Sequence, residues 1–458
     1  MSRLSASWIA SLTALAAYGA GAAAAQTPPT AAKEESPPLK VSGSFRVRHE
    51  TIDGQARAGF NSSDELINLR TRIAAEYDAG VLRFGGELYD SRAYHADAGT
   101  PLSTNEVNSL ELVQAYVAAD FDQPWGPGTK ASVQAGRFTL NLGARRLVAA
   151  DDFRNTTNGY TGIKLDGQWA GGVTATGIYV LPQIRRPDNF VSLSDNEVEL
   201  DRETKALQLF GGLVTIPVSP DKAALQVSYF GLDERDQSDI ATRDRDLDTF
   251  GLRYFREPAA DTFDFDIEAF AQTGSVSAST VPAAASLDVS AQYLHAEAGY
   301  RWTSAWKPRI AFEYEYASGD ETSGEYNRFD TLFGMRRAEI APAGLYNSVG
   351  RANINSPGIR LEVEPSPAWD AFIGWKALWL ASDTDAFSTT GVRDVTGSSG
   401  NFAGNQIDAR VRYWLVPQTL RLETNLVYLA KGDFLKSAPN APPSSNSFYA
   451  AFDITASF

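Results

Sequence analysis

The chain has 458 residues, a net charge of −15 at pH 7 and no cysteine. An acidic balance of this size argues against nucleic-acid binding, and the lack of cysteine excludes disulfides and thiolate metal sites. The only histidines are His49, His95 and His295, and no local signature of a Ser/His/Asp arrangement accompanies them. We therefore predict that the chain is not an enzyme and holds no cofactor or metal.

The N-terminus predicts a cleavable signal peptide over residues 1–25. Arg3 precedes an apolar stretch rich in Ala and Leu that ends in a small-residue cleavage pattern. A transmembrane anchor is the alternative, but the apolar run is short and no stop signal follows it. Residues 26–39 are rich in Pro, Ala, Ser and Glu, which predicts a flexible periplasmic tail. The remaining residues, 40–458, are expected to form one outer-membrane β-barrel.

Most of this region alternates apolar with polar residues, as β-strands with one wet face do. In 307–318, for example, Ile310 and Phe312 alternate with positions that include Glu313 and Glu315. A soluble sandwich also alternates, but here the polar face repeatedly carries full charges at successive positions. A closed membrane barrel accommodates that pattern, because its charged face lines a watery lumen and its apolar face meets lipid.

The alternation predicts eighteen strands, an even number, as single-chain bacterial barrels require. They lie near 40–50, 66–78, 80–92, 108–121, 130–139, 160–169, 171–182, 203–216, 222–232, 247–257, 261–273, 289–303, 307–318, 355–365, 367–382, 404–416, 418–431 and 446–458. The connections alternate strictly between short and long, as in a barrel with both ends in the periplasm. We expect the short turns to face the periplasm, the segment 319–354 to be exposed at the cell surface, and no plug domain.

The C-terminal strand supports the same fold. Phe448, Phe452 and Ile454 share one face, and the chain ends on Phe458. This resembles the closing strand of outer-membrane barrels, in which a terminal Phe serves as an assembly signal. The expected location is the Gram-negative outer membrane, in contact with lipid and lipopolysaccharide. The barrel-assembly machinery is an expected partner through the strand that ends at Phe458.

Basic residues dominate the candidate solute pathway. The pore-lining candidates are Arg46, Arg48, Arg70, Arg72, Arg92, Arg137, Arg145, Arg146, Arg309, Arg360, Lys376, Arg410 and Arg412. Two interpretations stay open: cross-strand ion pairs with lumenal acids that fill a wide barrel, or a conduit whose guanidiniums bind an anionic solute. The first and last strands adjoin in a closed barrel, so the arginines of the first two strands and of 404–416 are expected to form one basic wall.

Two features of the long loops also stay open. The loop 140–159 either folds inward and narrows the pore or lies outside it. Acidic residues in the outer loops, such as Asp383, Asp385 and Asp394, fit either solvated loops or Ca²⁺ binding.

Several short motifs resemble the alginate-export family of outer-membrane channels. Gly136-Arg137-Phe138, followed by Leu142-Gly143-Ala144-Arg145-Arg146-Leu147, is similar to that family's Gly-Arg … Gly-x-x-Arg-Leu signature. Tyr316-Ala317-Ser318-Gly319-Asp320 and the closing Gly432-Asp433-Phe434 also look like family segments. The resemblance spans nearly the whole mature chain. It implies an eighteen-stranded monomeric barrel with an arginine-lined pore for a uronate polysaccharide.

We therefore expect a passive channel for an anionic saccharide or polysaccharide, by export or uptake. Weak, repeated arginine sites would let the solute enter and leave. The alternatives are a general or nutrient-specific porin without saccharide preference, an outer-membrane hydrolase, and a surface-binding or structural protein.

Overall fold

The computed structural model describes residues 38–218, 222–237, 239–321, 324–335 and 339–458. The predicted signal peptide, 1–25, and all but the last two residues of the predicted tail, 26–39, lie outside these ranges. The described part contains eighteen β-strands and two short helices, Phe190–Ser194 (α1) and Asp433–Ser437 (α2). None of its helices has the length and apolar character needed to span a bilayer.

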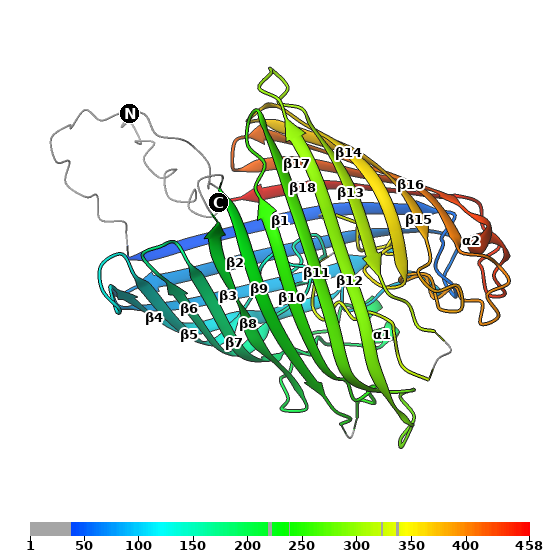
Figure 1. Cartoon of the computed structure of the whole chain (residues 1–458), viewed down its shortest axis with the longest axis horizontal. Coiled ribbons are helices and arrows are strands. Elements are labelled where there is room, and N and C mark those ends of the chain that lie inside the picture. Colours follow the sequence, from blue (N-terminus) through cyan, green and yellow to red (C-terminus); the bar gives the residue numbers. More distant parts are fainter. Residues whose placement is uncertain (1–37, 219–221, 238, 322–323, 336–338) are drawn as a thin grey trace.

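Each strand pairs antiparallel with its neighbours in chain order. The strands are β1 Leu39–Asp53, β2 Ser63–Asp78, β3 Leu82–Tyr94, β4 Asn108–Asp122, β5 Lys130–Phe138, β6 Tyr160–Gln168, β7 Thr174–Pro182, β8 Leu207–Val218, β9 Ala223–Glu234, β10 Asp246–Arg256, β11 Thr262–Ser277, β12 Ser286–Arg301, β13 Arg309–Ala317, β14 Ile354–Ser366, β15 Trp369–Trp379, β16 Phe402–Val416, β17 Leu420–Lys431 and β18 Ser447–Ser457. β1 also pairs with β18, so the sheet closes into a barrel (Figure 1). The prediction of an eighteen-stranded antiparallel barrel is confirmed.

Short and long connections alternate around the barrel. The short turns occupy 79–81, 123–129, 169–173, 219–222, 257–261, 302–308, 367–368 and 417–419. The long loops occupy 54–62, 95–107, 139–159, 183–206, 235–245, 278–285, 318–353, 380–401 and 432–446. β11 and β12 extend further toward the long-loop end than the sequence predicts, because Val276 and Leu287 still pair there. The C-terminus lies at the short-turn end (Figure 1).

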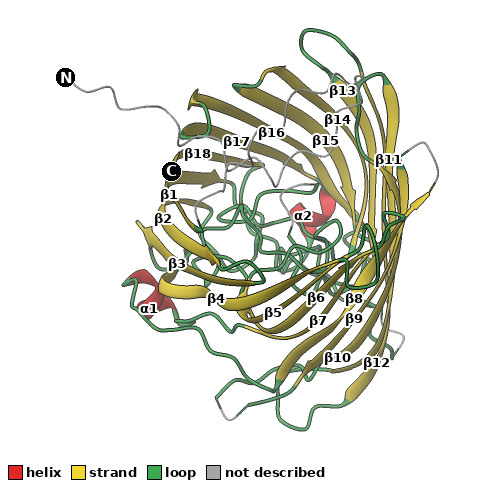
Figure 2. Ribbon diagram, turned by 90° about the vertical axis from the view of Figure 1, so that its left-hand side faces the viewer, coloured by secondary structure: helices red, strands yellow, loops and turns green. Residues whose placement is uncertain are grey.

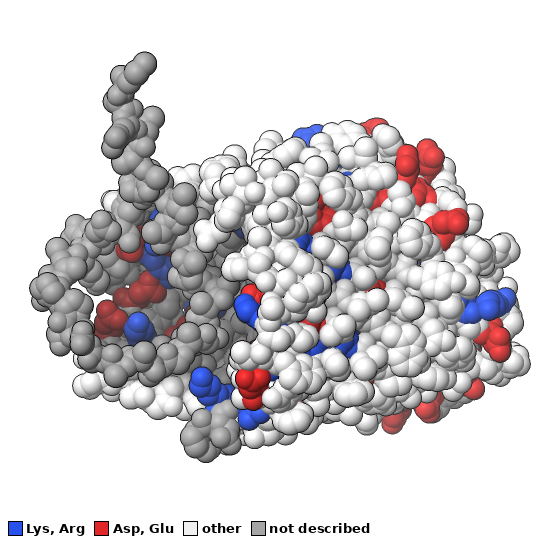
Figure 3. Space-filling view, turned by 90° about the horizontal axis from the view of Figure 1, so that it is seen from above, with Lys and Arg blue, Asp and Glu red and all other residues white. Residues whose placement is uncertain are grey.

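The barrel is apolar outside and charged inside. On β13, Ile310 and Phe312 are exposed, whereas Arg309, Glu313 and Glu315 are buried. Uncharged residues cover most of the face seen in Figure 3, and acidic side chains gather at the long-loop end. This arrangement reverses that of a soluble protein and suits a wall with lipid outside and a polar lumen inside.

Loops fill the lumen toward the long-loop end. The segment 319–354 was predicted to be surface-exposed, and that prediction is wrong for its second half: Leu345, Tyr346 and Val349 are completely buried, whereas Glu321 and Glu325 are exposed. The Tyr346 hydroxyl donates to Gln406 on β16 at 2.7 Å. Figure 2 shows the loops inside the ring of strands. The segment turns inward because its apolar side chains are removed from water there.

Candidate functional site

The loops 139–159 and 318–353 are joined to each other inside the barrel. The Phe333 amide donates to the Leu147 carbonyl at 2.9 Å, and the Ala149 amide donates to the Phe333 carbonyl at 3.1 Å. A Cβ on Gly334 would lie only 1.8 Å from the Arg146 carbonyl oxygen, so the contact tolerates only glycine there. The question left open for 140–159 is thereby answered: this loop folds inward.

Three arginines of the barrel wall hold this loop, and we call them the arginine clamp: Arg46 and Arg48 on β1 and Arg70 on β2. Arg46 donates to the Arg154 carbonyl at 2.8 Å. Arg70 donates to the carbonyls of Asp152 and Arg154 at 3.1 and 2.9 Å. Arg48 donates to the Phe153 carbonyl at 2.8 Å. The segment 152–154 thus presents its backbone oxygens to three guanidiniums.

Carboxylates of the barrel wall lie beside two arginines of the clamp. Asp453 on β18 binds Arg48 at 2.6 Å and lies 3.7 Å from Arg46. Glu50 lies 3.7 Å from Arg48. Within the described residues Arg70 forms no ion pair, and its hydrogen bonds go to neutral carbonyls. The Asp152 carboxylate also acts electrostatically on Arg70 from beyond ion-pair distance, so each arginine of the clamp has a carboxylate in its surroundings.

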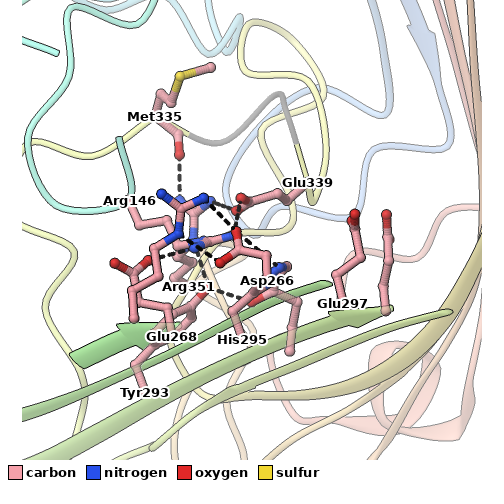
Figure 4. Close-up of polar contacts among 12 residues, drawn as sticks. Arg146, Asp266, Glu268, Tyr293, His295, Glu297, Met335, Glu339 and Arg351 are labelled. Atoms are coloured by element: carbon pink, nitrogen blue, oxygen red, sulfur yellow. Dashed lines mark hydrogen bonds and ion pairs between the residues drawn. The ribbon is translucent and has the colours of Figure 1, made fainter. Parts of the chain in front are cut away.

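A second set of contacts, the loop junction, ties both loops to the opposite wall (Figure 4). Its members are Arg146 from loop 139–159, Glu339 and Arg351 from loop 318–353, and Asp266, Glu268, His295 and Glu315 from β11, β12 and β13. Arg146 binds Glu268 at 2.5 Å, Glu339 at 2.6 Å and Asp266 at 2.8 Å. Arg351 also binds Glu339. His295 contacts Glu315 at 2.7 Å.

The charges of the loop junction stabilise one another. Burial alone would raise the pKa of Glu339, but Arg146 and Arg351 hold it well below its usual value. Burial likewise opposes the charge of Arg146, yet carboxylates led by Glu339 hold its pKa well above the usual range. His295, Glu315 and Glu339 bring possible metal ligands within 4.8 Å of one another. Two arginines already neutralise Glu339, which disfavours a divalent cation at this place.

The predicted residues Arg309, Arg360 and Lys376 face the lumen but are buried in ion pairs. Arg309 binds Asp264 and Glu297. Arg360 lies 2.9 Å from Glu313, and Lys376 also binds Glu313. These contacts correspond to the interpretation of cross-strand ion pairs that fill the barrel.

The predicted residues Arg72, Arg410 and Arg412 face an open part of the lumen toward the short-turn end. Arg72 is paired with Glu87 at 2.6 Å, and its side chain is 35% exposed. Arg410 and Arg412 both bind Asp370 at 3.0 Å, with 22% and 33% exposure. The partial exposure of these three guanidiniums leaves them accessible from the lumen, unlike the buried pairs.

Two predicted pore residues do not face the lumen. Arg92 lies on the outer side of β3, where it pairs with Asp90 at 3.0 Å. Arg137 shares the outward parity of exposed Val133 on β5, and its guanidinium binds Glu203 of loop 183–206 at 2.5 Å. Arg145 is half-buried in the inward loop and forms no ion pair with another described residue.

Sequence reasoning missed Glu339 and Arg351, which complete the loop junction. Both lie in the segment that was expected at the cell surface. The apolar residues Ile340, Leu345 and Tyr346 were the available signal. Large apolar side chains gathered in one loop indicate that the loop is buried and not surrounded by water.

Two buried carboxylates make the packing of the long loops sensitive to pH. Burial raises the pKa of Glu106, in loop 95–107, from 4.5 to about 7. Burial, together with the nearby charge of Glu111, raises the pKa of Asp201, in loop 183–206, from 3.8 to about 7. Between about pH 4 and pH 7 the packed loops therefore bind more protons than unfolded loops do. Their stability falls as pH rises through this range and levels off above it.

We expect Glu106→Gln combined with Asp201→Asn to remove this pH dependence. One pKa unit corresponds to about 1.4 kcal/mol, so the double variant should gain a few kcal/mol of loop stability at about pH 8 and little at about pH 4. Limited proteolysis of the detergent-solubilised barrel across this range measures the effect. Asp188→Asn, which changes an exposed carboxylate of the same loop, is the matched control. Equal protease resistance of the unmodified barrel at both pH values would contradict the prediction.

Comparisons with known proteins agree on the architecture. Residues 38–448 match the model of the alginate export family. The barrel is similar to three structures from Pseudomonas aeruginosa: OccK2 (OpdF) in complex with glucuronate (TM-score 0.56, 12% identity, 92% of this chain and 96% of that one), OccK9 (OpdG) (0.58, 11%, 92% and 98%) and the outer membrane protein OpdK (0.56, 9%, 92% and 99%). A comparison with curated proteins found no match. Identities this low show a shared fold only.

Proposed function

Since the chain belongs to the alginate export family, we propose that it is a passive channel for an anionic saccharide or polysaccharide, such as a uronate polymer. It is a β-barrel of the Gram-negative outer membrane, as its family and fold require. The solute moves along the lumenal arginines. A pore without an energy source is reversible, so the concentration gradient sets the direction of transport.

The observation that carries this proposal is the set of partly exposed guanidiniums in the lumen toward the short-turn end. Arg72, Arg410 and Arg412 are held by carboxylates yet remain accessible. Guanidiniums bind carboxylates with paired hydrogen bonds, and several such sites in series bind a uronate weakly enough for release. The glucuronate complex of OccK2, a barrel of similar fold, supports the same solute class.

We also propose an oligomeric state and further partners, on the basis of the fold. We propose that the chain works as a monomer, since the pairing of β1 with β18 closes the barrel within one chain. Lipid and lipopolysaccharide surround the apolar outer face. The strand that ends at Phe458 is the proposed contact for the barrel-assembly machinery, and the short turns are proposed to face the periplasm.

Changing Arg410 and Arg412 to Ala is expected to lower the permeability of anions relative to cations. The double change leaves Asp370 without its two basic partners, so the local potential becomes more negative. Reversal potentials in planar bilayers measure the effect, which should be largest at low salt because charges are screened within about 8 Å at physiological ionic strength. Arg92→Ala, on the outer face, is the control.

Two outcomes would contradict the selectivity prediction. One is an unmodified channel that already prefers cations, and the other is a double variant whose reversal potential does not move. The acidic positions 264, 266, 268, 313 and 315 would then set the selectivity. A channel that conducts anions without any block by uronates would instead favour the general porin, whose supporting observation is that most lumenal arginines are paired with carboxylates.

A further inference from the structure

A pocket at the long-loop end of the barrel lies apart from the arginine clamp and the loop junction. Its volume is about 440 Å³, within the range of small-molecule sites. The lumenal side chains of Leu247, Val276 and Val289, all nearly completely buried, form its floor. Its rim comes from the loops 235–245 and 318–353.

The barrel wall holds the rim of this pocket in place. The Tyr326 amide donates to the Asp288 carbonyl at 2.8 Å, and the Ser290 amide donates to the Tyr326 carbonyl at 3.1 Å. Arg243 Nε donates to the Ser277 carbonyl at 2.8 Å. The guanidinium carbon of Arg243 lies 4.5 Å from the centre of the Tyr326 ring. These contacts preorganise the pocket, which lowers the cost of ordering it around a ligand.

Positive charge in the pocket centres on Arg243. The other two rim arginines, Arg245 and Arg328, are each bound to carboxylates at 2.5–2.8 Å. Arg243 forms no ion pair with any carboxylate in the described ranges, and Asp320 acts on it only from beyond ion-pair distance. The half-buried guanidinium of Arg243 can bind the carboxylate of a ligand. The aromatic ring and the apolar floor beside it offer a surface for the C–H face of a sugar.

We propose that this pocket is an outer capture site for a sugar that carries a carboxylate, such as a hexuronate. The inference rests on the proposed channel function and adds a solute site at its long-loop mouth. The solute carboxylate binds Arg243, and the sugar ring packs against Tyr326 and the apolar floor. A neutral hexose lacks the charged contact and binds less well. Because the pocket opens at one end of the barrel, it serves solute arriving from that end.

Single-channel recording with glucuronate added to one side at a time tests this site. We expect Arg243→Gln to lower the rate of glucuronate block several-fold when the sugar is added on the long-loop side. The rate from the short-turn side and the conductance without sugar should stay unchanged. Arg243→Lys should retain part of the effect. Arg235→Gln is the matched control, since Arg235 belongs to the same loop, is 73% exposed and pairs with Asp233.

The outcomes separate this site from the channel function. If glucuronate blocks the unmodified channel from both sides but Arg243→Gln behaves like Arg235→Gln, the outer site is overturned and the channel function stands. An equal loss of block from both sides also overturns the site. If glucuronate blocks from neither side, the proposed function fails, and the site fails with it. Glucose that blocks as often as glucuronate would show that Arg243 does not select for charge.

Discussion

Replacing Arg46 and Arg70 together by alanine is expected to open the pore and raise its single-channel conductance severalfold. Three hydrogen bonds of 2.8–3.1 Å from these guanidiniums hold the carbonyls of the segment 152–154. Hydrogen bonds to charged groups contribute about 1.5–3 kcal/mol each. Their loss weakens the attachment of the segment 152–154 to the barrel wall, so this segment is expected to leave its inward position more often. Arg146 and the contacts with Phe333 still hold the other part of loop 139–159 in the lumen.

The control for this result removes two lumenal arginines that do not touch the loop. Arg83→Ala combined with Arg421→Ala changes the lumenal charge by the same amount, but these residues pair with carboxylates on the barrel wall. Conductance in planar bilayers should rise only in the variant without Arg46 and Arg70. A rise of similar size in both double variants would mean that charge alone, and not the arginine clamp, limits the current.

Arg146→Met is expected to destabilise the loop junction strongly. The change removes the Arg146 guanidinium from the buried carboxylates of Glu268 and Glu339. Removing one partner of a buried ion pair lowers the free energy of unfolding by about 3–5 kcal/mol. The loops 139–159 and 318–353 should become sensitive to added protease while the barrel stays intact. The chain has no cysteine, so a single introduced cysteine in either loop can report its accessibility.

Two further variants distinguish this effect from a general loss of stability. Arg146→Lys keeps the charge and should retain most of the protection. Arg421→Met removes a more exposed arginine, 3.5 Å from Glu423, and pairs of that kind contribute only about 0–1 kcal/mol. If Arg146→Met is no more protease-sensitive than Arg421→Met, the loop junction does not hold the two loops.

The sequence predicts the strands because one face of the barrel wall contacts lipid throughout and the other face contacts the polar lumen. Lipid selects Ile310 and Phe312 and the lumen selects Glu313 and Glu315, so the period of two is visible in the chain. The alternation also predicts which residues of a strand point inward. Arg137 belongs to a motif of the family resemblance, but alternation from Val133 directs its side chain outward. Alternation from Arg83 directs Arg92 outward in the same way.

No periodic pattern in the sequence shows where the long loops fold. Arg70 is recognisable as lumenal, but its partners are backbone carbonyls at 152–154. Every residue has a carbonyl, so the residue types of the sequence do not identify these partners. The pairing of Arg146 with Glu339 and Glu268 joins residues far apart in the chain. Such contacts depend on how two loops fill one volume. Only the unexpected apolar residues of 318–353 indicate that this loop leaves the solvent.

The loop 139–159 leaves β5 at Phe138 and returns to β6 at Tyr160, and these two residues are paired neighbours. Its carbonyls therefore remain tethered near the guanidiniums even when they are displaced. Tethering of this kind gives an effective concentration on the order of millimolar. A solute with the same affinity for the guanidiniums would have to be present at a comparable concentration to replace the carbonyls. At equal affinity, a dilute anion would therefore leave the carbonyls of loop 139–159 in place at the arginine clamp.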